Sequence, residues 1–189
     1  MRKIPGLLFL CFFLFGVAPC HKAVFACVQD DPNKILWSSD RKLSWNDFKG
    51  LVDTSNVAVK AMTYSEIKID GSYLKDSIHI YKVGCYFLTN RSWHVVNDSS
   101  TLSHEQLHFD ISELFARKIR KSFDSLYVKR IVDVEKHEKL FNLYIQNCDK
   151  YQDLYDSEVY FNEKKQLFWK KKIAAELLKL KEWGYIPEK

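Results

Sequence analysis

The sequence predicts an α+β fold, with a small antiparallel sheet in the N-terminal half and three long helices after it. Between residues 57 and 88, apolar side chains alternate with polar ones or cluster in β-branched and aromatic runs, which is typical of strands. From residue 102 onward, apolar residues recur every three or four positions, which is the period of an amphipathic helix. The strands therefore precede the helices, an order that favours α+β over alternating α/β.

Residues 1–26 are typical of a secretory signal peptide. Two basic residues precede the apolar run Leu7–Ala18, and small residues follow it. The run is shorter than the ~20 residues that span a bilayer, so we expect no stable transmembrane helix. We predict cleavage before Cys27 and export to the periplasm, the cell envelope or the exterior. A lipoprotein signal, with Cys20 or Cys27 as the lipid-anchored residue, is the alternative.

Residues 27–189 are expected to form a single domain. The chain contains only 6 Gly and 4 Pro, so no flexible linker divides it. Its formal net charge of +5 falls to +2 without the first 26 residues, which contribute three basic residues and no acidic one. A domain with so little net charge gives no reason to expect a nucleic-acid partner.

The predicted sheet has two main strands. Residues 57–70 place alternate apolar side chains on one face, and Asp70–Gly71 predicts the turn that follows. Residues 77–88 are rich in β-branched and aromatic side chains and predict the second strand. Residues 41–50 are predicted to form a loop ahead of the sheet. Its apolar anchors and final glycine are Trp45, Phe48 and Gly50.

Three helices are predicted, over residues 102–119, 125–148 and 162–183. Polar residues at 97–100 are candidate N-caps for the first helix. The third helix is rich in lysine, and we expect a solvated lysine face, with binding to anionic lipid or to a partner as the alternative. The buried stripe expected for this helix comprises Leu167, Ile173 and Leu177.

The cysteines leave two alternatives open. In an oxidising compartment, Cys85 and Cys148 would be able to form a disulfide. Two buried free thiols fit the sequence equally well. No pair of cysteines in the predicted mature domain has the C-x-x-C spacing of a zinc site.

The residues that best indicate chemistry lie in HEQLH, residues 104–108, within the first predicted helix. His104 and His108 lie one turn apart and ~40° apart around the helix axis, so both rings can bind one ion. Catalytic zinc sites use three protein ligands and leave a fourth position open for water. Glu105 lies ~100° from His104, where it can take a proton from that water. We therefore predict zinc as cofactor, His104 and His108 as ligands, and Glu105 as the catalytic base.

The same spacing also occurs on solvated helices that bind nothing. Apolar Ile111 and Phe115, close behind His108, predict that the histidines are partly buried, which favours a metal site. Asp110 lies ~160° from His108 and is expected to anchor the helix through Arg117 or a loop amide.

The string HEQLHFDISELFARKIR, residues 104–120, resembles the signature of a bacterial secreted family known as domain of unknown function 922, whose members are described as predicted zinc-dependent proteases. RKLSWNDFKG at 41–50 resembles the W-x-D-F-x-G opening of that family. The resemblance implies a zincin-like domain over residues 27–189, with the HExxH motif on the first long helix. It also implies an exported zinc-dependent metallopeptidase with a peptide or protein substrate. Weaker marks are AMT at 61–63, RSW at 91–93, YDSE at 155–158 and QLFW at 166–169.

One position departs from the family pattern. Phe161 stands where the family has a histidine, and a phenyl ring cannot coordinate zinc. The third ligand must then come from elsewhere, and Glu158 is the preferred candidate. The departure also favours an alternative function, a non-catalytic zincin-like envelope or surface binding protein that lacks a complete zinc site. The remaining candidates are Asp156, Glu135, His137 and Glu138 for the third ligand, and Tyr155 or Tyr160 for a hydrogen bond to the oxyanion.

Overall fold

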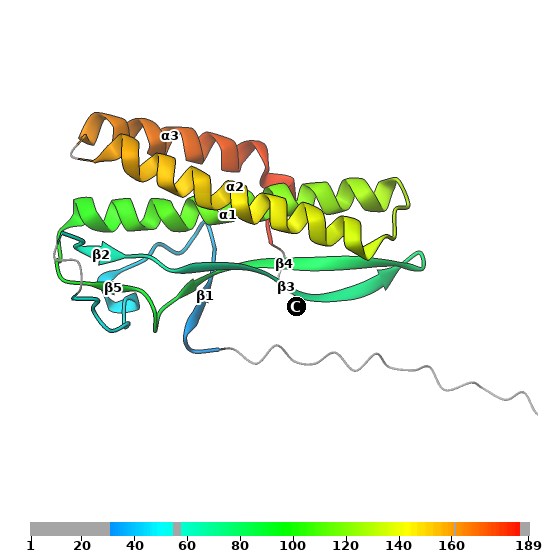
Figure 1. The fold of residues 1–189 in the computed structure, drawn as a ribbon, viewed down its shortest axis with the longest axis horizontal. Helices are drawn as coiled ribbons and strands as arrows, with labels where there is room; N and C mark the ends of the chain where they lie inside the picture. The colour runs from blue at the N-terminus through cyan, green and yellow to red at the C-terminus, as the bar shows by residue number, and fades with distance from the viewer. Residues whose placement is uncertain (1–30, 55–57, 161, 186–189) are drawn as a thin grey trace, which may run out of the picture. The chain divides into compact units, whose positions relative to one another are not determined.

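Strands precede helices in the computed structural model, which confirms the predicted α+β fold (Figure 1). The structure describes residues 31–54, 58–160 and 162–185, within a compact unit that spans residues 31–189. The predicted signal peptide, the lipid-anchor alternatives Cys20 and Cys27, and Phe161 lie outside the described residues. Within those residues, no helix is long and apolar enough to cross a membrane. The elements are, in order, β1 (Lys34–Leu36), the 3₁₀ helix η1 (Trp45–Asp47), β2 (Ala61–Met62), β3 (Ser65–Lys75), β4 (Ile78–Leu88), β5 (Trp93–His94), α1 (Ser99–Val128), α2 (Val134–Val159), α3 (Glu163–Lys179) and the 3₁₀ helix η2 (Lys181–Trp183).

The central strand of the larger sheet is β4, which pairs antiparallel with β1 on one side and with β3 on the other. A second, two-stranded sheet joins β2 to β5, with Ala61 opposite His94. α1 packs against β4 and β3, and α2 and α3 pack on α1, all on the same side of the larger sheet (Figure 1). The core between α1 and this sheet includes Val83, Cys85, Phe87, Phe109, Ala116, Ile119 and Phe123.

The β3–β4 hairpin turns at Asp76 and Ser77, so the predicted turn at Asp70–Gly71 is wrong. Asp76 and Ser77 have positive φ angles of 50° and 64°, the backbone twist that a two-residue hairpin loop requires. At Asp70–Gly71 the pairing register shifts instead, which marks a β-bulge inside β3. The dipeptide therefore bends a strand that continues beyond it.

The helix boundaries differ from the predicted ones because α1 is longer. Asp98 caps its N-terminus through its side chain, and the helix continues for 30 residues. The chain reverses at Arg130, which has a φ of 54°. Asp133 then caps α2, which begins at Val134, later than the predicted residue 125. The later start changes which residues of α2 face α1.

The loop over residues 41–50 is anchored on the smaller sheet. The Trp45 ring stacks on His94 with the ring centroids 4.5 Å apart. A Cβ atom at Gly50 would lie 2.6 Å from the carbonyl carbon of Arg91, so a larger residue would force the two segments apart. The W-x-D-F-x-G string therefore has a structural role, which is to hold this loop against the chain that leads into β5.

One buried carboxylate, that of Glu113, joins α1 to the sheet and to the end of α3. Its Oε1 accepts hydrogen bonds from Arg117 Nε at 2.8 Å and from Arg120 Nη1 at 2.9 Å. Arg120 also donates to the Val83 carbonyl in β4, and Arg117 donates to the Leu177 carbonyl in α3. Glu113 is only 1% exposed, so water does not stabilise its charge. The carboxylate is stabilised by the two guanidinium groups, and they in turn by the carboxylate.

Replacing Glu113 by glutamine should lower the free energy of unfolding by about 3–5 kcal/mol, because one buried guanidinium group, that of Arg117, and one largely buried group, that of Arg120, lose their counter-charge. Urea unfolding followed by circular dichroism measures the change. Glu135→Gln is the matched control, since Glu135 pairs with Lys139 on solvent-exposed side chains. Equal destabilisation by the two substitutions would contradict the role assigned to the buried carboxylate.

Candidate metal centre

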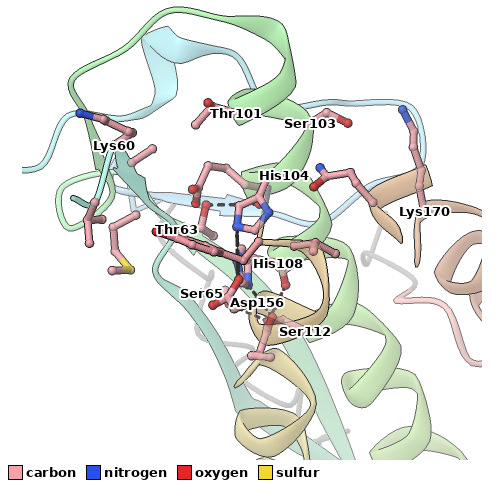
Figure 2. A pocket seen from close by; sticks show the side chains of 18 of the residues that line it. Lys60, Thr63, Ser65, Thr101, Ser103, His104, His108, Ser112, Asp156 and Lys170 are labelled. Atoms are coloured by element: carbon pink, nitrogen blue, oxygen red, sulfur yellow. Dashed lines mark hydrogen bonds and ion pairs between the residues drawn. The ribbon is translucent and has the colours of Figure 1, made fainter. Parts of the chain in front are cut away.

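The N-terminal part of α1 presents His104 and His108 to a cleft (Figure 2). The two imidazoles lie on one face of the helix, and their Nε2 atoms are 3.0 Å apart. The rings therefore converge, as the i, i+4 spacing predicts.

Asp156, near the end of α2, brings a carboxylate to the two imidazoles (Figure 2). Its Oδ1 lies 3.2 Å from His104 Nε2 and 2.9 Å from His108 Nε2. α2 runs antiparallel to α1, so its last turns return to the level of the histidines (Figure 1). In the part of the chain that the structure describes, these three residues are the one group of His, Cys, Asp or Glu side chains placed to hold a metal ion.

Glu158, the third ligand preferred from the sequence, does not join this group. Its Oε2 accepts hydrogen bonds from Trp169 Nε1 at 3.1 Å and from Lys165 Nζ at 3.2 Å, both on α3. Two positions that are two residues apart on a helix differ by ~200° around its axis. Asp156 consequently faces α1 while Glu158 faces α3. The residue beside the histidines is therefore Asp156, and the prediction of Glu158 is wrong.

The candidates at 135–138 lie at the opposite end of α2. His137 packs between aromatic rings of the core, with centroid distances of 5.0 Å to both Tyr81 and Phe123. The start of α2 is level with the end of α1, because the chain reverses at Arg130. His137 is therefore a core residue, Glu135 and Glu138 are exposed, and none of the three joins His104, His108 and Asp156.

Gln152 orients the His108 ring. Its amide nitrogen donates to the His108 carbonyl at 3.0 Å and to Ser112 Oγ at 3.1 Å. The amide oxygen is thereby directed to His108 Nδ1, at 2.7 Å. A carbonyl oxygen can only accept, so Nδ1 must carry the hydrogen. In the neutral His108 ring the lone pair is then on Nε2, which faces Asp156 and His104 and is the atom that a metal would bind. In the protonated ring the same Nε2 carries a hydrogen and donates to Asp156.

Tyr155 performs the corresponding role for His104. Its hydroxyl oxygen lies 2.9 Å from His104 Nδ1, and the hydroxyl donates to the His104 carbonyl at 3.4 Å. This arrangement allows Nδ1–H to donate to the phenol oxygen and leaves Nε2 for a ligand. Tyr155 is fully buried behind the His104 ring, so its role is to orient that ring. Of the two tyrosines predicted to contact an oxyanion, Tyr160 is the one that lines the cleft.

The electrostatics of the group keep Asp156 ionised. Burial raises the pKa of Asp156, but hydrogen bonds from His104 and His108 lower it further, so that it lies well below its usual range. Burial lowers the pKa of His108, whereas the hydrogen bond and charge of Asp156 raise it, and the net pKa is above the usual value. Burial, followed by the charges of Asp156 and Glu105, raises the pKa of Tyr155, which stays a neutral phenol.

The donor set fits a zinc ion. Two imidazole nitrogens and one carboxylate oxygen form a ligand set that catalytic zinc sites use. Zinc bonds of about 2.0–2.1 Å at tetrahedral angles separate ligand atoms by about 3.3 Å. The observed separations of 3.0, 3.2 and 2.9 Å are only slightly shorter. All three residues line the cleft, so a fourth position would open into it.

Glu105 lines the same cleft but is not one of the three converging ligands. It is 4% exposed, and its backbone carbonyl accepts a hydrogen bond from Thr63 Oγ1 at 3.2 Å. This contact ties the helix to the chain that follows β2. The charge of Glu105 acts on His108, and a carboxylate near a metal-bound water is what a general base requires.

Asp110 anchors α1 through a different partner from the expected one. Its Oδ1 accepts from Trp37 Nε1 at 2.8 Å and from Gln106 Nε2 at 2.9 Å. Arg117 binds Glu113 instead. Asp110 therefore connects α1 to the segment after β1 and does not belong to the group of His104, His108 and Asp156.

Cys85 and Cys148 are both free and buried, so the structure has the free thiols and not the disulfide. Burial, followed by the charge of Asp149, raises the pKa of Cys148 to about 12. Burial also raises the pKa of Cys85. Both thiols stay protonated near neutral pH, which makes them poor metal ligands.

The cleft has a volume of about 1160 Å³. β2 and the start of β3 line one side, the first turns of α1 line another, and the last turns of α2 and the first turns of α3 complete it. Figure 2 shows Lys60 and Lys170 on opposite sides of the histidines. His104, His108 and Asp156 therefore line a cleft that is partly open and not a closed pocket.

Comparisons of the chain with protein-family models, with curated proteins and with solved structures find no significant match. The family resemblance therefore rests on the motifs quoted above, and the function is argued from the site.

Sequence reasoning missed Gln152, because an amide does not titrate and carries no recognised motif. A usable signal exists. Gln152 and Asp156 are four residues apart, like His108 and His104, so two i, i+4 pairs on successive helices face each other. Once the turn between the helices is located, this matched spacing identifies both partners.

Asp156→Asn should weaken zinc binding by more than about 100-fold, beyond the 10–100-fold typical of residues that only support a ligand. Glu158→Gln should retain binding, because its side chain faces α3. Competition with a chelating dye, using residues 31–189, measures both affinities. The opposite ranking of the two variants would return Glu158 to the ligand set.

Gln152→Ala should weaken zinc binding by about 10–100-fold, because the His108 ring loses the contact that selects its tautomer. Gln146→Ala, an exposed glutamine on the same helix, is the matched control. Isothermal titration with zinc compares the two. Unchanged affinity in the Gln152 variant would show that the ring needs no support from α2.

Proposed function

We propose that this protein is an exported zinc-dependent metallopeptidase. The observation that carries the proposal is the convergence of His104 Nε2, His108 Nε2 and Asp156 Oδ1 at distances close to those of a zinc site. The HExxH string and its resemblance to the domain of unknown function 922 family support the same activity. The signal-like residues 1–26 support export.

Each of the site residues has a distinct task in the proposed reaction. A bound Zn²⁺ would polarise the scissile carbonyl and acidify a water at its open position. Glu105 accepts the proton of the attacking water and donates it to the leaving amine. Gln152 and Tyr155 hold the two imidazoles in one orientation, so no ring has to turn during the reaction.

The shape of the cleft supports an extended peptide as substrate. Its volume of about 1160 Å³ exceeds that of most small-molecule pockets, which hold about 300–1,000 Å³. β2 lines the cleft, and among the described residues it pairs only with β5, which leaves its second edge open. An extended chain can add to such an edge through backbone hydrogen bonds, with little dependence on its side chains.

The alternative function is a non-catalytic zincin-like binding protein of the envelope or surface. Phe161, in place of the histidine of the family pattern, is the observation that favours it. Asp156 weakens this argument, because a carboxylate already stands beside the two histidines. Folded wild-type protein that binds zinc weakly or not at all would favour the alternative, whereas tight stoichiometric zinc would refute it.

Glu105→Gln should lower peptidase activity by about 10²–10⁴-fold, because the amide cannot accept the proton of the attacking water. Zinc content should stay at the wild-type level, since Glu105 is not a ligand. Cleavage of a library of proteome-derived peptides, followed by mass spectrometry, provides the measurement. Glu138→Gln, on an exposed position of α2, is the control. Full activity in the Glu105 variant would refute the proposed base.

A further inference from the structure

The outer face of α3 carries apolar side chains that are more than half exposed in the described structure. Leu167, Phe168 and Leu178 are 53%, 56% and 69% exposed. Leu167 was expected in the buried stripe with Ile173 and Leu177, and the structure places only the latter two in the core. At 100° per residue, the exposed apolar positions and two exposed alanines, 174 and 175, fall within an arc of about 120°.

Lysines lie within and beside this arc. α3 contains six lysines and two glutamates. Lys165 pairs with Glu158, and Lys172 lies 4.4 Å from the centroid of the Trp169 ring, so these two lysines are held by the fold. Lys164 and Lys171 are exposed within the apolar arc, and exposed Lys179 lies about 20° beyond its edge. They span about 22 Å of the helix axis at 1.5 Å per residue.

This mixture fits a lipid surface better than a protein partner. Lysine is depleted from the buried centres of protein–protein interfaces, because its charge is costly to desolvate there. At a bilayer surface the opposite holds, since a lysine stem covers apolar area while the ammonium group reaches the anionic headgroups. Leucine and phenylalanine between lysines are the residues that interfacial helices insert below the headgroups.

The position of α3 allows this contact. The helix packs on α1 and α2, and Figure 1 shows it at the outside of the helical layer, away from the larger sheet. Its buried side, with Trp169, Ile173 and Leu177, secures it to the domain. The helix can therefore meet a flat surface without leaving its place in the fold.

We propose that the outer face of α3 binds the surface of bilayers that contain anionic lipid, with the helix lying parallel to the membrane. Leu167 and Lys170 also line the cleft, so the bound domain would hold its cleft close to the lipid surface. The residues that make up the proposed surface are Lys164, Leu167, Phe168, Lys171, Leu178 and Lys179.

Co-sedimentation of residues 31–189 with vesicles tests the proposal. This unit has its own core, and its use removes any contribution from the apolar run near the N-terminus. Vesicles of equal parts phosphatidylglycerol and phosphatidylcholine should bind it, vesicles of phosphatidylcholine alone should bind it far less, and salt should weaken binding. The assay needs no metal, so its outcome is independent of the proposed peptidase activity.

Two variants locate the contact. The triple change Lys164→Gln, Lys171→Gln and Lys179→Gln should lower the partition coefficient about a hundredfold, at about fivefold per lysine. Phe168→Ser should lower it by about tenfold or more. The matched control, Lys49→Gln, Lys129→Gln and Lys136→Gln, removes the same charge from exposed positions outside α3 and should bind like the wild type.

Three outcomes would overturn the proposal. They are no binding to the anionic vesicles, equal losses in the α3 and control triple variants, or equal binding to the two vesicle types. A dimer of residues 31–189 that dissociates on Phe168→Ser, without vesicle binding, would assign this face to a second copy of the chain.

Discussion

The register between α1 and α2 is the constraint on which the site depends. Arg130, where the chain reverses, lies midway in the sequence between His104 and Asp156 and midway between His108 and Gln152. Residues equidistant from the turn lie level, because both helices rise by the same ~1.5 Å per residue. Rotating α2 by one residue, ~100°, would carry the carboxylate and the amide away from the histidines. The turn at the far end of the helical hairpin thus determines which residues of α2 lie beside the two histidines.

This register places a row of polar side chains in an interface that is otherwise apolar. Such groups cost ~1–3 kcal/mol each when buried without partners. Here the row satisfies itself, because Ser112 bonds Gln152, Gln152 bonds His108, and Tyr155 bonds His104. The two Nε2 atoms and the Asp156 carboxylate contact one another at the end of the row and line the cleft. A ligand entering the cleft would therefore replace contacts within this group, while the other bonds of the row hold the two helices together.

Sequence patterns predict those features that neighbouring residues determine. The apolar periods predict the order of strands and helices, and HEQLH predicts the converging histidines, since one helix sets their spacing. The choice of Asp156 over Glu158 depends on which side of α2 faces α1, and local patterns do not contain that information. Asp70–Gly71 is a similar case, because the same dipeptide suits a turn or a bulge, and only pairing with β4 decides between them.

The two carboxylates at the end of α2 contact different helices, α1 for Asp156 and α3 for Glu158. Asp156 contacts His104 directly. Glu158 holds the Trp169 indole, whose ring lies 5.4 Å from that of Tyr155, centroid to centroid. Tyr155 in turn bonds the His104 ring. Glu158 is therefore separated from His104 by two aromatic side chains, and its bond to Trp169 joins the end of α2 to α3, whose outer face we propose to bind anionic bilayers.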